Sequence, residues 1–442
     1  MLSYPTYLSY ATYLMYPRFP VSTVRDDSPP AAARTAPALL NAHWPWWVFG
    51  FLLALNLLKG MRMPGRWAVT HYLFTYQNGF IKRGFFGEIL HRLFGGWTAS
   101  YFLLSAIAIA VLVAVVWLIA RIAKRLPDTP ERWSWLVVFL ASPAIALFAH
   151  LVGYLEQLSY LAIAVLLLQR RWRMRVAIAI ACAILLPLIH EAALFWAAPL
   201  VGLALLLGGD EGAPVWSRRM QTVAAVAALW VVTTAITGTA GRVTNAQMND
   251  LRDDRTRFFE IRPRQDAFST LTVPLGDAYR DMRTRWADPE TQYDMAFSLL
   301  VFGPGAIFLI LVATRQARRL DLSDGARRVI VLGVVAAVAA PMLLHIIGWD
   351  RHRWNALATL NAGLAGLIVL SARVAPTAAP HRSTAPRSIA IALAISLWSI
   401  AADPVLFDSY GDNHPPFGAQ IRFLIDAIRS PNRAMWMPKV GQ

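Results

Sequence analysis

Charged residues are scarce in this chain of 442 residues: Asp, Glu, Lys and Arg make up only 15% of it, whereas hydrophobic residues make up 57%. Soluble domains usually carry about a quarter charged residues. The apolar residues also fall in blocks of roughly 15 to 20, about the length of one helical membrane crossing. These proportions exclude an ordinary soluble domain and predict an all-α, polytopic integral membrane protein.

Cysteine is nearly absent, since Cys182 is the single one and lies inside an apolar block. One cysteine excludes an intrachain disulfide and a cysteine-based metal site, and it is best interpreted as a buried packing thiol. The sequence also lacks a Walker A motif, a Gly-x-Ser-x-Gly motif, a His-Glu-x-x-His motif and a dinucleotide-binding fingerprint. The first residues have neither the basic nor the apolar region of a signal peptide.

Eleven apolar segments are predicted to cross the membrane as helices, because a backbone surrounded by lipid must satisfy its own hydrogen bonds. They are 44–63, 99–120, 133–149, 152–168, 176–189, 192–208, 221–237, 296–313, 329–347, 355–371 and 388–402. Residues 44–402 are therefore expected to form a transmembrane bundle, between a disordered cytoplasmic tail at 1–43 and an extracytoplasmic segment at 403–442. A large loop at 238–295, with 9 Arg and 10 Asp or Glu, is expected to fold over the outer mouth of the bundle.

The distribution of charge predicts the orientation in the membrane. Segments on the side of the N-terminus contain 21 Lys and Arg against 8 Asp and Glu, whereas the rest of the chain contains 21 against 18. Basic residues in short, acid-poor loops mark the cytoplasmic side. We therefore expect a bacterial inner-membrane protein with a cytoplasmic N-terminus and a periplasmic C-terminus. The same rule explains much of the net charge of +16 without nucleic acid as a partner.

The first external loop contains the sequence YQNGFIKRGFFGE, in which glycines and aromatic residues surround Lys82 and Arg83. Paired cations suit a phosphate or pyrophosphate group, and glycines such as Gly84 allow close approach of the backbone. We interpret Lys82, Arg83 and Gly84 as substrate-binding and Glu88 as a catalytic candidate. The alternative is an interfacial segment with snorkelling cations and aromatic anchors.

A second external motif, WDRHRW, lies between two apolar segments late in the chain. Asp350 could act as a general base or ligate a metal, and Arg351 and Arg353 could hold an anion. The alternative is an Asp–Arg pair that caps two helices. No cofactor is expected, and the sequence leaves a divalent metal open.

Two pairs of predicted crossings, at 133–168 and 176–208, are shorter than two full crossings require. Each pair turns at polar residues, Glu156 in the first and His190 with Glu191 in the second. Ionisable groups at membrane depth are costly and usually functional, so these three residues are catalytic candidates. The alternative for His190 and Glu191 is a helix-terminal pair whose members satisfy each other.

Three further groups of residues receive weaker interpretations. His150 and His345 are best explained as satisfied polar groups near the same outer level. Asp412, Asn413 and His414 favour a turn. Within the large loop, Arg255 or Arg257 could face an acidic glycan.

The stretches GFIKRGFFGEIL and GWDRHRW resemble motifs of bacterial membrane proteins of exopolysaccharide and O-antigen production, the Wzy-type polymerases and EpsG-like proteins. The topology also resembles that of GT-C glycosyltransferases, which use a lipid-linked donor on the outer face. The two motifs and the hydropathy pattern together cover about a tenth of the chain. GT-C enzymes usually carry an acidic residue in the first external loop, and here Glu88 alone could correspond to it.

These observations predict an outer-face glycosyltransferase or polysaccharide polymerase that uses a polyprenyl-pyrophosphate-linked glycan. Its expected partners are membrane lipids, that glycan and other proteins of exopolysaccharide assembly. Two alternatives stay open: a transporter or flippase of a lipid-linked saccharide, and a non-catalytic subunit of a glycan export assembly.

Overall fold

The computed structural model describes residues 36–60, 62–95, 100–126, 129–208, 212–256, 263–348, 350–372 and 385–401. Within these ranges the chain is helical and contains no β-strand. The predicted segment 403–442, with Asp412, Asn413 and His414, lies outside the described residues, as do Arg257 and the side chain of Arg255. Of the predicted tail, only the part from Ala36 onward is described, and it belongs to the first helix.

The helices are α1 (Ala36–Gly60), α2 (Arg66–His71), α3 (Gly84–Phe94), α4 (Tyr101–Ala123), α5 (Pro130–Ala141), α6 (Pro143–His150), α7 (Glu156–Leu168), α8 (Trp172–Ile189), α9 (Ala193–Trp196), α10 (Ala198–Leu207), α11 (Trp216–Ala240), α12 (Asn245–Thr256), α13 (Gln265–Ser269), α14 (Leu275–Arg285), α15 (Pro289–Ala317), α16 (Asp324–Met342), the 3₁₀ helix η3 (Leu343–Ile346), α17 (Arg351–Leu370) and α18 (Ala385–Ala401).

The starts of several helices follow from local sequence. Thr129 precedes α5 and accepts a hydrogen bond from the backbone N–H of Arg132, and Ser142 precedes α6 and accepts one from Ala144. Asp288 caps α15 in the same way. Each of these three caps is followed by a proline in the first helical turn, where the missing N–H costs nothing. The cap at Ser142 also explains why α5 and α6 are separate helices, bent by 46°.

Five helices are long and apolar enough to cross a membrane, namely α4, α8, α11, α15 and α16 with η3. A sixth crossing results if α5 and α6 form one bent span. Each of the eleven predicted apolar segments contains at least one helix, but those with α1, α7, α9 and α10, α17 and α18 are not among these spans. The described chain is thus an all-α protein whose apolar helices indicate a membrane-embedded bundle, with five or six spans established by length and composition rather than eleven.

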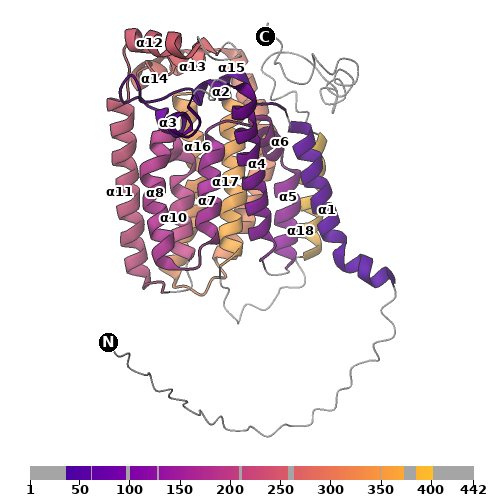
Figure 1. Ribbon diagram of the computed structural model, residues 1–442. Helices are drawn as coiled ribbons and strands as arrows, with labels where there is room; N and C mark the ends of the chain where they lie inside the picture. Colours follow the sequence, from indigo (N-terminus) through magenta and orange to yellow (C-terminus); the bar gives the residue numbers. More distant parts are fainter. Residues whose placement is uncertain are drawn as a thin grey trace, which may run out of the picture. The chain divides into compact units, whose positions relative to one another are not determined.

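Helix α17 lies at the centre of the bundle, where it packs against α15, α16 and α10 (Figure 1). Every residue from Arg353 to Leu370 is buried. A side chain at Gly363 would overlap the ring of Phe139, so the small residues of α17 allow close approach to α5. Asn361 donates hydrogen bonds to the carbonyls of Trp196 (2.9 Å) and Ala337 (2.7 Å), which fixes α17 against its neighbours. Small residues and interhelical hydrogen bonds are the usual means of helix association in membranes.

One end of the bundle is covered by short helices. The segment between α11 and α15 forms α12, α13 and α14, which lie at the same end as α2 and α3 (Figure 1). Phe74 and Ile81, on either side of a turn, form a small apolar cluster with Phe268 and Leu271. The Thr70 hydroxyl also accepts a hydrogen bond from the backbone N–H of Arg264 (3.0 Å). These contacts hold the Lys82–Arg83 segment against the ends of the long helices.

Candidate functional site

Arg83 lies immediately before α3 and makes a two-fold ion pair with Glu191, in the turn between α8 and α9. Its Nε donates to Glu191 Oε2 at 2.9 Å and its Nη2 to Oε1 at 2.6 Å. Arg83 has a φ of 65°, and it is the only non-glycine residue with positive φ in the described part of the chain. Such backbone strain in a non-glycine residue concentrates at functional sites.

Glu191 is ionised in this arrangement. Burial alone would raise its pKa, but the Arg83 guanidinium, together with its hydrogen bonds, holds the pKa of Glu191 well below its usual range. Bidentate Arg–carboxylate pairs are among the strongest charge-assisted hydrogen bonds. A carboxylate held in this way is a weak proton acceptor, so the geometry gives Glu191 the task of orienting Arg83.

Two buried histidines flank the pair and stay neutral. His71 donates from Nδ1 to the Trp67 carbonyl at 2.9 Å, which leaves the Nε2 lone pair facing Arg83 Nη1 at 3.4 Å. Burial and the Arg83 charge lower the pKa of His71 to about 3. Burial also holds the pKa of His190 well below its usual value. Its Nδ1 accepts a hydrogen bond from the Ala192 N–H (3.2 Å), so His190 and Glu191 do not form a charged pair.

Lys82 is a buried cation, and only 7% of the residue is exposed. Its backbone N–H donates to the Gly241 carbonyl at the end of α11 (2.8 Å), but its ammonium group forms no ion pair or hydrogen bond with any residue in the described ranges. Burial lowers the pKa of Lys82; the Glu191 charge opposes this effect, and the Arg83 and Arg242 charges add to it. Two other cations, Arg83 and Arg242, thus act on Lys82 against one carboxylate.

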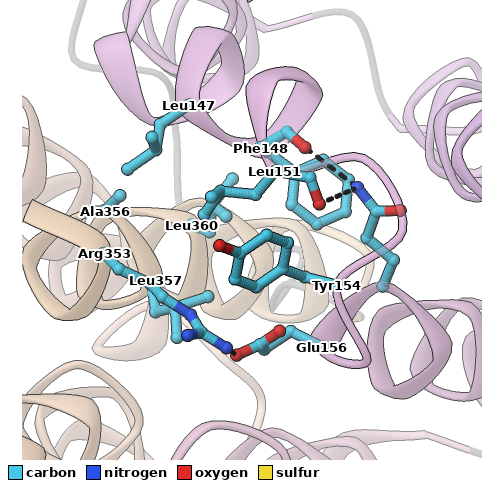
Figure 2. A pocket seen from close by; sticks show the side chains of 10 residues that line it. Leu147, Phe148, Leu151, Tyr154, Glu156, Arg353, Ala356, Leu357 and Leu360 are labelled. Atoms are coloured by element: carbon cyan, nitrogen blue, oxygen red, sulfur yellow. Dashed lines mark hydrogen bonds and ion pairs between the residues drawn. The ribbon is translucent and has the colours of Figure 1, made fainter. Parts of the chain in front are cut away.

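A second ion pair joins Glu156, the first residue of α7, to Arg353 in the first turn of α17 (Figure 2). Both side chains are buried, and the Arg353 guanidinium lies over the rings of Tyr154 (4.5 Å) and Trp354 (4.9 Å). Arg353 also approaches Asp350, with 3.6 Å between Nη1 and Oδ2. The Arg353 charge acts electrostatically on His71, so the two ion pairs are neighbours in one cluster.

A cavity of about 10 Å³ adjoins the Glu156–Arg353 pair. Figure 2 shows that apolar side chains such as Leu147, Leu357 and Leu360 form much of its wall. This volume is about the minimum for one water molecule. The cavity therefore holds nothing larger than a water molecule in this conformation.

Asp350 and Arg351 form the open edge of the cluster. Arg351 Nη2 donates to Asp294 Oδ2 of α15 at 2.9 Å, which ties the start of α17 to the start of α15. The Asp350 side chain is 36% exposed. Desolvation raises the pKa of Asp350 to about 6, and the neighbouring Arg351 charge partly opposes this effect. Asp350 is therefore the carboxylate of the cluster best suited to accept a proton near neutral pH.

The structure thus brings together most residues that the sequence singled out. Lys82, Arg83, His190 and Glu191 form one part of the cluster, and Glu156, Asp350 and Arg353 form the adjoining part, with Arg351 at the rim. No described contact joins Glu88 to the Arg83–Glu191 pair.

Glu88 and Gly84 have local roles in the loop before and within α3. Glu88 accepts hydrogen bonds from Arg92 (2.6 Å) and from the backbone N–H of Tyr76 (3.0 Å). A Cβ on Gly84 would lie 2.7 Å from the Tyr76 ring and 2.8 Å from Ile81, so close packing accounts for this glycine. Both residues shape the loop that presents Lys82 and Arg83.

Several residues of the cluster carried no sequence signal. His71, Tyr154, Asp294 and Thr270 lie outside both motifs, and Thr270 accepts a hydrogen bond from Arg83 at 3.2 Å. Arg242 was one of many arginines in the large loop. His345, interpreted as a satisfied polar group, forms a hydrogen bond with Asn355 (3.1 Å). Among the described residues, no group of three or more His, Cys, Asp or Glu side chains is placed to hold a metal ion.

Fold and site together define an all-α, membrane-embedded protein with a largely buried cluster of cations and carboxylates at one end of its bundle. Comparisons with protein-family models, curated proteins and solved structures give no match.

Proposed function

We propose that the chain is a glycosyltransferase or polysaccharide polymerase that takes sugars from a polyprenyl-diphosphate carrier. The observation that carries the proposal is that the buried Lys82 ammonium forms no ion pair or hydrogen bond with a described residue, while Glu191, the carboxylate whose charge acts on it, is already paired with Arg83. A buried, unpaired cation is costly. An anionic substrate would offset that cost, and a diphosphate matches several converging cations.

The location of the cluster favours a lipid-linked donor over a soluble one. The cluster lies where α7, α8 and α17 begin or end, so a diphosphate bound there would have its lipid chain beside the apolar helices. The proposal includes eleven crossings and a cluster that faces the outer side of a bacterial inner membrane. The charge distribution along the sequence supports this orientation.

In the proposed reaction, the oxygen of an acceptor hydroxyl attacks the anomeric carbon of the donor sugar. The bond from that carbon to the diphosphate oxygen breaks, and the diphosphate leaves with the electron pair. Lys82 and Arg83 stabilise the charge that develops on the leaving group. Asp350 accepts the proton of the acceptor hydroxyl, while Glu191 and His71 hold Arg83 in place.

Asp350 gives the proposal a pH test. Because the pKa of Asp350 is raised to about 6, its carboxyl group is protonated below that pH and cannot accept a proton. We expect kcat to rise about tenfold per pH unit up to roughly pH 6 and to level off above it. In Asp350→Asn, kcat should fall by about 10² to 10⁴-fold and lose this dependence, with donor binding retained.

The matched control for Asp350→Asn is Asp294→Asn, which removes the rim carboxylate that pairs with Arg351. The control should keep both the inflection near pH 6 and most of the turnover. An unchanged pH profile in Asp350→Asn would show that another group is the base.

A further inference from the structure

We infer that the opposite end of the bundle contains a binding site for the phosphate headgroup of an anionic phospholipid. The site lies at the junction of α15 and α16, away from the polar cluster at the start of α17. It is a cavity of about 540 Å³ lined by Arg318, Asp324, Arg327, Arg328, Val331 and Leu332. This volume accommodates a phosphoglycerol headgroup.

The arginines that line the cavity differ in whether their side chains already form ion pairs or hydrogen bonds. Arg327 pairs with Asp324 (3.0 Å) and donates to the Leu320 carbonyl (3.0 Å), so it is part of the local structure. Arg318 and Arg328 are exposed, and neither side chain forms an ion pair or hydrogen bond within the described ranges. The neighbouring Arg319 instead pairs with Glu131 of α5 (2.8 Å). Two guanidinium groups thus remain available to a phosphate.

The apolar residues next to the cavity argue for a lipid rather than free phosphate. Five exposed residues follow one another at helical spacing on one face of α16 and its continuation in η3. They are Arg328, Leu332, Val335, Ala339 and Leu343. Leu332 is 66% exposed although it is apolar. A headgroup held by Arg318 and Arg328 would place its acyl chains along this stripe. Basic pockets at the ends of transmembrane helices bind anionic headgroups in this way.

The experiment measures thermal stabilisation of the purified full chain by phosphatidylglycerol, by phosphatidylcholine and by inorganic phosphate. We expect phosphatidylglycerol to raise Tm, and phosphatidylcholine and inorganic phosphate to have much smaller effects. In Arg318→Gln/Arg328→Gln, the concentration of phosphatidylglycerol needed for half the effect should rise about tenfold or more.

The control is Arg173→Gln/Arg218→Gln, which removes two exposed arginines from the same end of the bundle, at the starts of α8 and α11. It should respond to phosphatidylglycerol like the unmodified chain. If both double variants needed a similarly increased concentration of phosphatidylglycerol, the effect would reflect diffuse attraction to the membrane surface. That result would overturn the assignment. Stabilisation by inorganic phosphate equal to that by phosphatidylglycerol would overturn the lipid as ligand.

Discussion

Replacement of Lys82 by methionine is expected to lower kcat by about a hundredfold or more without lowering Tm. The loss of turnover follows because Lys82 is a cation of the proposed diphosphate site, and removal of one preorganised charge of this kind costs about 10² to 10³ in rate. The Tm is expected to stay the same or rise because the buried ammonium forms no ion pair or hydrogen bond with a described residue. Its removal therefore relieves a desolvation cost. Methionine keeps an unbranched apolar side chain close to the length of the lysine stem and removes only its charged end. Turnover and thermal unfolding of the same preparation check both expectations.

Arg92→Met is the matched control for Lys82→Met, since Arg92 lies nearby in α3 but its side chain is 78% exposed. It should leave turnover and Tm near those of the unmodified chain. A fall in Tm for Lys82→Met together with unchanged turnover would identify Lys82 as a structural residue and remove the main support for the anion site.

The Arg83–Glu191 pair is expected to produce the largest effects on stability. Arg83→Leu and Glu191→Leu each leave one partly buried charge without its partner, and each should lower the free energy of unfolding by about 2 kcal/mol. The double variant leaves no orphaned charge, so it should lose clearly less than the two single variants together. Thermal or denaturant unfolding of the three variants in one detergent provides the measurement.

An exposed ion pair of similar geometry provides the reference for this double-mutant cycle. Arg285 Nε and Asp281 Oδ2 lie 2.8 Å apart on α14, and both side chains are about half exposed. The corresponding cycle should give a coupling energy of at most about 0.5 kcal/mol. If the Arg83–Glu191 cycle gave as little, the pair would not be the preorganised, partly buried element that the structure shows.

Much of the cluster could be predicted from the sequence because its residues occupy the turns between apolar segments. Charged residues such as Glu156 and Glu191 can be recognised in the sequence because they occur where a short apolar hairpin turns. Burial of a charge at membrane depth is costly, so such residues usually have a functional role. Because successive helices run up and down through the bundle, every second turn along the chain lies at the same end. Topology alone therefore places these turns together. Lys82, Arg83, Glu191, Asp350 and Arg353 were found in this way, and the structure brings them together.

The pairings within the cluster could not be predicted in the same way. Arg83, which has a positive φ, pairs with Glu191 at the end of α8 rather than with Glu88, which is five residues away in the sequence. His71 joins the cluster because the apolar contact of Phe74 with Phe268 folds α2 against α13. Long-range packing of this kind leaves no local pattern in the sequence.

The number of crossings illustrates a different difficulty. Hydropathy marks apolar segments, but it does not distinguish a full span from a shorter buried helix. Ser142 and Pro143 divide one predicted segment into α5 and α6, and α9 and α10 divide another. Residues in α17 are buried by other helices rather than by lipid, so its apolar character reflects packing within the bundle.

The central claim is that the cluster cleaves a sugar–diphosphate bond, and turnover of a polyprenyl-diphosphate-linked oligosaccharide by the purified chain tests it most directly. The account predicts release of polyprenyl diphosphate together with a lengthened glycan, and loss of both products in Lys82→Met. If the unmodified chain only moved the intact lipid-linked sugar between vesicle leaflets, or bound it without breaking the bond, the account would be contradicted.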